Sequence, residues 1–492
     1  MIDLLPIAAF WSLALWGVAS RKPVLIYLFF ATLPFGAFAA VPPFLTGGLT
    51  FTPTPLVTVL IVLRTFCKPQ GPAEILSLAL APHRLMLLFL FWLVAGVTTF
   101  FMPRLFENAV MIVPIRGILS DTAPLRPTLQ NLSQFAYLTI AVFSVFAFAV
   151  SLQSAAMRQH ALRALCLGGA MTAATGLLDH ASRYLPLDPL LAPFRTATYA
   201  LVTDVEVLGS RRVTGLMPEA SAYGGICLAL MAGLYFYRRA IFDGTLRNVW
   251  VPMIFALLTL CAWLSTSSGT YVGIALLLGV AGLEWLVRAN ADSRRFAIYR
   301  RGLGGELSVL IALLVGVSLL LIVRPEVLAP VFELIDRMVL QKTASNSFAE
   351  RGMWRAVAWD SVLATHGFGV GIGSTRASSS FVANLSGAGL VGGALYYGFA
   401  LQSLLRPTAG TPIESQLLIS GFRFSFVPSF VVTLMVGDAD FGGMTAFGFG
   451  LVTALSITNA RRTENLAGTA LHCALHAQGQ TRSANAHATW IG

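Results

Sequence analysis

Two arginines and a glutamate stand just before a long apolar stretch that begins near residue 221. Arg211 and Arg212 come first, and Pro218-Glu219 follows them. Guanidinium groups bind phosphate and diphosphate oxygens through paired hydrogen bonds, and a carboxylate at a water–membrane boundary can act as a general base. Glu219 has a second explanation, because Pro218 suits the start of a helix and a carboxylate in the first helical turn complements the helix dipole. The residues alone leave both roles open.

A second pair of arginines, Arg351 and Arg355, lies four residues apart in a segment over 347–367 that reads as one complete helix. Residues at i and i+4 share a helix face, so the two guanidinium groups would form a fork for phosphate or diphosphate. A solvated basic face or a pair of salt bridges explains the same spacing equally well.

A glycine-rich segment follows that helix. The alternating glycines are Gly367, Gly369, Gly371 and Gly373. No strand–helix–strand unit surrounds them, so they do not make a nucleotide fingerprint. The spacing predicts a tight turn whose backbone N–H groups can also bind an anion. Arg376 adds a cation at the mouth of the next apolar stretch, and His366 stands directly before the first glycine.

The elements that must position these residues are membrane helices. The chain has 492 residues, of which 56% are hydrophobic and 11% are charged, whereas soluble domains have about 25% charged residues. This composition excludes a disordered chain, a disulfide scaffold and a soluble multidomain enzyme. A span needs about 20 apolar residues, and we predict an all-α polytopic membrane protein with 12–14 spans, thirteen being favoured. The predicted spans are 4–20, 24–41, 51–66, 85–102, 134–152, 161–178, 221–237, 249–265, 268–287, 305–323, 379–404, 415–436 and 441–459.

The distribution of Lys and Arg predicts which connections face the cytoplasm. About 20 of the 33 basic residues fall in one alternating set of short connections, which we assign to the cytoplasm. The long connections 103–133, 179–220 and 324–378 then lie outside, with the N-terminus outside and the C-terminus inside. These three hold 13 basic residues, 12 of them arginine, which orientation does not explain: Arg104, Arg116, Arg126, Arg183, Arg195, Arg211, Arg212, Arg324, Arg337, Lys342, Arg351, Arg355 and Arg376. An anionic head group at the outer membrane face is the ligand we expect, and we expect no nucleic-acid partner.

The remaining residues point away from other functions. The five cysteines show no metal-type spacing, and we expect neither a metal nor a cofactor. No carboxylate lies in the middle of a predicted span and no repeated halves are evident, which disfavours an ion-coupled transporter. We predict one transmembrane domain over 1–462 and a disordered cytoplasmic tail over 463–492.

Four segments in register resemble the superfamily of O-antigen ligases and Wzy-type polysaccharide polymerases. They are Arg212-x-x-Gly215 with Pro218-Glu219-x-Ser221-x-Tyr223, the turn Leu264–Tyr271, Arg351-x-x-Trp354 with Gly369-x-Gly371-x-Gly373, and Gly389-Leu-Val-Gly392. Ser378-Ser379 occupies the position of the His-Asn pair that is typical of ligases, and the Arg-Ala-Ser-Ser-Ser sequence at 376–380 is more similar to exopolysaccharide polymerases.

The resemblance implies a GT-C-like glycosyltransferase of the bacterial inner membrane that works on the periplasmic side. Such enzymes transfer a glycan from undecaprenyl diphosphate to a sugar hydroxyl, without a nucleotide sugar or a metal. Chain-length-regulating and export proteins would be its partners, beside the lipid-linked oligosaccharide and the bilayer. Our leading hypothesis is a polymerase, with an O-antigen ligase second and a lipid-linked sugar or polysaccharide transporter as an alternative of another class.

Within this hypothesis, the candidate residues take two roles. Glu219 is the first choice for a catalytic base and His366 the second. The candidate ligands of the diphosphate are Arg212, Arg351 and Arg355, followed by Arg376 and Arg211.

Overall fold

A computed structural model describes residues 4–115, 121–207, 209–290, 302–324, 326, 332–334, 336, 341, 346–408, 410–437 and 439–462. Three of the 13 basic residues in the long connections lie outside the described residues, namely Arg116, Arg337 and Lys342. So does the predicted disordered tail over 463–492.

The described chain is mostly helical, which confirms the prediction of an all-α polytopic membrane protein. Nine helices in the described ranges are long and apolar enough to cross a membrane. They are α5 (Met86–Leu105), α6 (Leu129–Ser151), α7 (Ala155–Ala181), α9 (Ala220–Tyr237) with the turn that continues it to Ala240, α10 (Val251–Leu264) with the turn that precedes it from Leu246, α11 (Ser268–Ala289), α12 (Leu303–Val323), α16 (Ile413–Val436) and the last described helix, Gly442–Arg462. Helices suit these sequences because a bilayer offers the backbone no hydrogen-bonding partner, so each span must satisfy its own polar groups.

The other four predicted spans form shorter or broken helices. They are α1 (Leu5–Ala19), α2 (Val24–Thr32), α3 (Pro53–Phe66) and α15 (Ser380–Leu404). The predicted extent 24–41 of the second span is wrong, because α2 has only 9 residues and Pro34, Pro42 and Pro43 follow it, which cannot donate to a continuing helix. The total of thirteen spans therefore stays a prediction.

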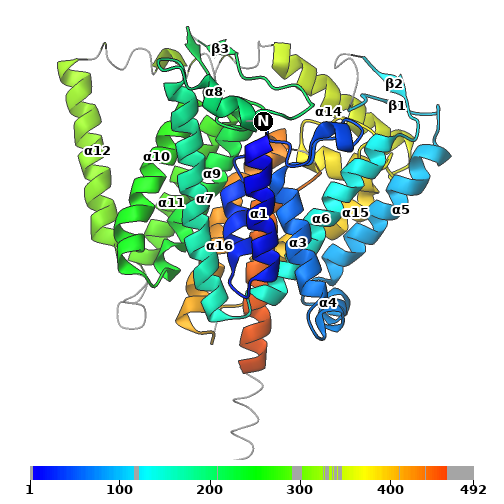
Figure 1. The fold of residues 1–492 in the computed structure, drawn as a ribbon, viewed down its shortest axis with the longest axis horizontal. Coiled ribbons are helices and arrows are strands. Elements are labelled where there is room, and N and C mark those ends of the chain that lie inside the picture. The colour runs from blue at the N-terminus through cyan, green and yellow to red at the C-terminus, as the bar shows by residue number, and fades with distance from the viewer. Residues whose placement is uncertain are drawn as a thin grey trace, which may run out of the picture.

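The long connections gather at one end of the bundle, at the top of Figure 1, which we call the loop end. It holds α14 (Asn346–Ala364), α8 (Asp188–Leu191), the hairpin of β1 (Met111–Ile112) with β2 (Ala123–Pro124), and the hairpin of β3 (Glu206–Val207) with β4 (Ser210–Arg211). Both hairpins are antiparallel, with Met111 opposite Pro124 and Glu206 opposite Arg211. The short helix α4 (Gly71–Leu80) lies at the opposite end (Figure 1). Single-turn helices are Pro43–Leu45, Ala192–Phe194, Arg238–Ala240 and Leu246–Trp250.

At the end opposite the loop end, an ion-pair cluster explains two carboxylates of the spans. Glu284 of α11 pairs with Arg239 and with Arg288, at 3.1 Å for the second pair. Glu306 of α12 pairs with Arg238 at 2.5 Å and with Arg288 at 3.0 Å. Above this cluster α12 stands apart from the other helices, with none of its residues buried (Figure 1). The two carboxylates thus neutralise arginines and tie the base of α12 to the bundle.

The glycine-rich segment threads between α5, α6 and α15. Gly369, Gly371 and Gly373 all have positive φ, between +81° and +89°, and a Cβ on them would lie 2.7, 3.0 and 2.7 Å from the nearest neighbouring atoms. Only glycine fits a left-handed backbone this close to other chain segments. Three N–H groups of the turn donate within the fold, from residue 369 to Thr365 Oγ1, from 370 to the Ser386 carbonyl and from 372 to Thr99 Oγ1. These three are thus not available to the anion that the sequence suggested.

The glycine-rich segment also explains a break in α15. Gly389 has φ +73° and ψ 177°, outside the helical region, and its Cβ position is 2.5 Å from the Phe368 carbonyl oxygen. We expect Gly389→Ala to lower the free energy of unfolding by about 1–3 kcal/mol, from left-handed strain and the forced displacement. Thermal unfolding of the detergent-purified protein measures the change.

Gly398→Ala is the matched control for Gly389→Ala. Gly398 lies in the same helix, and the nearest atom to its Cβ position is Leu87 Cδ1 at 3.8 Å. This variant should unfold at or slightly above the wild-type temperature, because alanine has the higher helix propensity. Equal unfolding temperatures for the two variants would contradict the assigned break at Gly389.

Candidate functional site

The predicted site residues lie at the loop end, in three segments. The first is the connection between α7 and α9, which carries Arg211, Arg212 and Glu219. The second is α14 with its C-terminus, and the third is the chain just before α15. The exposed members are Glu219, Arg355 and His366, and the half-buried ones are Arg211, Arg212, Arg351 and Arg376.

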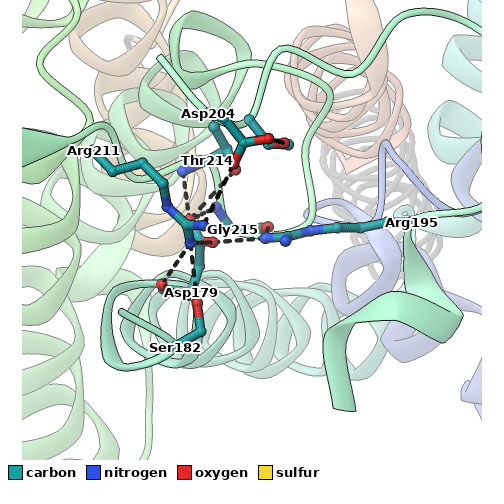
Figure 2. Close-up of polar contacts among 8 residues, drawn as sticks. Asp179, Ser182, Arg195, Asp204, Arg211, Thr214 and Gly215 are labelled. Carbon is teal, nitrogen blue, oxygen red and sulfur yellow. Dashed lines mark hydrogen bonds and ion pairs between the residues drawn. The ribbon is translucent and has the colours of Figure 1, made fainter. Parts of the chain in front are cut away.

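Asp179, in the last turn of α7, organises the first segment (Figure 2). Its carboxylate is 1% exposed. Arg195 Nη2 donates to it at 2.6 Å and Arg211 Nη2 at 3.0 Å, from opposite sides in Figure 2. The backbone N–H groups of Thr214 and Gly215 donate to its other oxygen at 2.7 and 3.0 Å. One buried carboxylate thereby fixes the course of the chain from residue 195 to residue 215.

Arg211 is engaged in this network. Besides the Asp179 carboxylate, its Nη2 reaches Ser182 Oγ at 3.0 Å, and its Nη1 lies 3.6 Å from the exposed Asp204. Its charge is already balanced by a buried partner, so we leave Arg211 out of the candidate site.

Arg212 points the other way, because successive residues of an extended chain alternate in direction. Its Nε donates to the Ser265 carbonyl and to Thr266 Oγ1, both at 3.1 Å. Thr266 has φ +44°, which is costly for a β-branched residue and occurs mainly at functional sites. The strained turn between α10 and α11 thus fixes the Nε edge of the guanidinium.

Arg212, Glu219 and Arg351 come together electrostatically. Burial lowers the pKa of Arg212, the Glu219 carboxylate and Tyr271 raise it, and the positive charge of Arg351 lowers it further. Two arginines from separate segments therefore lie within electrostatic range of each other. In the described part of the chain, neither forms an ion pair within 4 Å. Such a pair of like charges suits an anion that bridges them.

Glu219 is the N-cap residue of α9, one position before the helical turn in which the sequence placed it. Its side chain makes no capping hydrogen bond to the backbone. Instead it accepts a hydrogen bond from Ser221 Oγ. The carboxylate is exposed beside Arg212, so it is accessible to a substrate at the loop end.

Arg355 and His366 lie farther along α14. Arg355 is exposed, one helical turn beyond Arg351. His366, fifteen residues from Arg351, is about 22 Å away along the helix axis at 1.5 Å per residue. His366 takes the left-handed position at the helix end, with φ +52°, and the N–H of Gly367 closes the turn on the Val362 carbonyl at 2.8 Å. Gly367, the next residue, is left-handed as well, with φ +84°. The structure does not bring His366 together with Arg351, and we leave His366 out of the candidate site.

Arg376 connects α14 to the β1 region. Its guanidinium lies over the Trp354 ring, 4.8 Å from the centroid, and its Nη2 donates to the Ile115 carbonyl at 2.5 Å. Ser378, two residues on, donates to the carbonyl of Arg351 at 2.7 Å. The third segment is therefore packed on the first turns of α14, next to Arg351.

Sequence reasoning missed Asp179, and it included Thr266 only as part of the turn Leu264–Tyr271, without a role of its own. Asp179 sits at the boundary of a predicted span, and the partners of its carboxylate are 16 to 36 residues away in the chain.

In the described residues, no group of three or more His, Cys, Asp or Glu side chains is arranged to hold a metal ion. Comparisons of the chain with protein-family models, with curated proteins and with solved structures found no match.

Proposed function

We propose that this protein is a membrane glycosyltransferase of the polysaccharide-polymerase type, which extends a glycan carried on a lipid diphosphate. The observation that carries the proposal is the group formed by Arg212, Arg351 and Glu219 at the loop end of a helical membrane bundle. Two cations without an ion-pair partner within 4 Å in the described chain suit a diphosphate. An exposed carboxylate beside them suits a hydroxyl nucleophile. The resemblance in sequence supports the same reading.

The reaction that these groups serve is a displacement at an anomeric carbon. The acceptor hydroxyl oxygen forms the new bond to that carbon, and the bond from the carbon to the diphosphate oxygen breaks. The leaving diphosphate keeps the electron pair, and the guanidinium groups of Arg212 and Arg351 stabilise the developing charge. The hydroxyl proton passes to the Glu219 carboxylate. Each group thus has one task, and the atoms and charges balance.

The cellular setting follows from the same proposal. The loop end would face the periplasm of a bacterial inner membrane, where an undecaprenyl-diphosphate-linked repeat unit is presented at the bilayer surface. The lipid tail stays among the apolar helices while its head group reaches the arginines. Chain-length-regulating and export proteins would act on the same product.

Chain growth by the purified protein tests the proposal. We expect the protein in nanodiscs, given lipid-linked repeat units extracted from its native host, to produce a ladder of longer lipid-linked glycans. Nanodiscs enclose no compartment, so transport cannot produce that signal. Electrophoresis of the labelled glycans measures the ladder.

Two results would contradict a polymerase. A deletion strain that accumulates full-length lipid-linked polymer, rather than single repeat units, would favour a ligase instead. A purified protein that binds the repeat units without extending them would remove the enzymatic proposal.

A further inference from the structure

A cavity of about 130 Å³ opens at the loop end, between α6, the glycine-rich segment, the start of α15 and the chain before the last described helix. Its lining carries the charged or amide side chains of Gln134, Arg376 and Asp440, together with the hydroxyl side chains of Thr375 and Ser386. The proposed reaction does not use it. For comparison, an apolar cavity of about 150 Å³ takes up a benzene ring, so this smaller, open cavity can take the hydroxyl-bearing edge of a sugar ring but not a lipid chain.

The charges on this lining exclude a good diphosphate site. Among the described residues that line the cavity, one cation, Arg376, and one anion, Asp440, are the ionisable groups. A diphosphate would be repelled by the carboxylate, whereas Arg212 and Arg351 offer positive charge alone on their side of the loop end. The cavity therefore favours a neutral, polar ligand, and Arg376 leaves the set of diphosphate ligands that the sequence suggested.

The donor and acceptor groups match the hydroxyls of a sugar. Asp440 lines the cavity, its Oδ1 accepts the N–H of Gly442 at 3.0 Å, and each oxygen of a carboxylate can accept more than one hydrogen bond. The half-buried Arg376 also borders the cavity, with its Nη2 donating to the Ile115 carbonyl. The Gln134 amide adds two donors and an acceptor, and the described residues provide it no hydrogen bond. Neighbouring hydroxyls of a sugar ring both donate and accept, which this combination satisfies.

We propose that this cavity binds one sugar ring of the glycan through its hydroxyl groups. The assignment rests on the proposed function for the identity of the glycan. The cavity adjoins the proposed diphosphate site through α14, because Trp354 lies against Arg376 and is one helical turn from Arg351. A glycan whose diphosphate sits at Arg212 and Arg351 can therefore extend a sugar toward Arg376.

Two ligands and matched variants test this assignment. The first ligand is the oligosaccharide released by mild acid from the host's lipid-linked repeat units, which carries neither lipid nor phosphate. The second is undecaprenyl diphosphate without sugar. We expect Asp440→Asn and Gln134→Met each to weaken oligosaccharide binding about tenfold. Asp440→Asn removes the charge from an acceptor of a sugar hydroxyl, and Gln134→Met removes the amide that would bond to one. Undecaprenyl diphosphate should bind as to the wild type, and saturation-transfer NMR and fluorescence titration in nanodiscs measure the two affinities.

The controls separate this assignment from a loss of folding. Asn at position 440 still accepts the Gly442 N–H, because asparagine is a good helix cap. Gln130→Met is the matched variant for Gln134→Met, since Gln130 lies one turn earlier on α6 and does not line the cavity. It should leave both affinities unchanged.

Three results would overturn the assignment. They are an oligosaccharide affinity that neither variant changes, a wild-type protein that does not bind the oligosaccharide, and a loss of undecaprenyl diphosphate binding in Asp440→Asn. If the wild type shows no chain growth but the variants still weaken oligosaccharide binding, the proposed function fails while the sugar site stands.

Discussion

Replacing Arg212 by alanine is expected to reduce chain growth at least about 100-fold, the typical cost of removing one group that stabilises charge in the transition state. Arg212 is half-buried, its Nε is fixed by the Ser265 carbonyl and Thr266, and the charge of Arg351 acts on it. A guanidinium held in this way is preorganised for an anion, so its loss is not repaired by water. Initial rates with lipid-linked repeat units in nanodiscs measure the effect.

Arg212→Lys separates the contribution of the positive charge from that of the guanidinium geometry. Lysine keeps the positive charge but lacks the planar fork and the Nε–H that holds the strained turn. We expect an intermediate loss of about tenfold. Thermal unfolding of both variants should stay near the wild type, and wild-type chain growth by well-folded Arg212→Ala would remove Arg212 from the site.

Other arginines of the loop end provide graded comparisons. Arg351→Ala should approach the effect of Arg212→Ala, and the double variant should lose less than the product of the two, because both residues act on one ligand. Arg355→Ala should cost at most about fivefold, as exposed charge pairs contribute little. Arg126, an exposed arginine whose Nε donates to Asn108, is the control that should have no effect.

The helices could be predicted from the sequence because their signal is local. A run of about 20 apolar residues is sufficient for a span, and the pattern around Arg351 and Arg355 was sufficient for α14. The apolar pattern did not predict the extent of a helix or a break in it where contacts with distant parts of the chain determine them. The apolar run over 24–41 forms only the nine-residue α2, and the break of α15 at Gly389 follows from the approach of Phe368.

The candidate site was predictable by residue type but not by partner. A set of arginines in the long connections indicates an anion, yet residue type and spacing alone do not distinguish Arg211 from Arg212, which the resemblance ranks differently. The structure separates them, because Arg211 faces Asp179 and Arg212 faces the turn at Thr266. Neither contact has a local signature, since Asp179 lies 32 residues from Arg211 and Thr266 lies 54 residues from Arg212.

Asp179 is the residue whose replacement should affect stability most. Asp179→Asn keeps the size of the side chain but removes the negative charge that faces Arg195 and Arg211. Breaking a buried ion pair from one side costs about 3–5 kcal/mol, because the remaining charge is left buried without compensation. In addition, the NH₂ group of asparagine would face one of the N–H groups that now donate to the carboxylate, and that hydrogen bond would be lost. We expect a clearly lower unfolding temperature in detergent, together with a loss of chain growth.

A readout of the loop separates this effect from general unfolding. If Asp179 fixes the chain from 195 to 215, trypsin should cleave the variant after Arg195, Arg211 or Arg212 at temperatures where the wild type resists. Mass spectrometry of the first fragments identifies the cleavage sites. First cuts elsewhere in the chain would show that the carboxylate does not organise this connection.

Asp204→Asn is the matched control, because it removes the exposed partner of the same arginine. Asp204 is 84% exposed and lies 3.6 Å from Arg211, and an exposed pair contributes at most about 1 kcal/mol. Its unfolding temperature and trypsin resistance should match the wild type. If Asp204→Asn destabilised the protein as much as Asp179→Asn, charge at the loop end in general would be responsible. A difference between them instead assigns the stability of the connection, and with it the position of Arg212 and Glu219, to the one buried carboxylate.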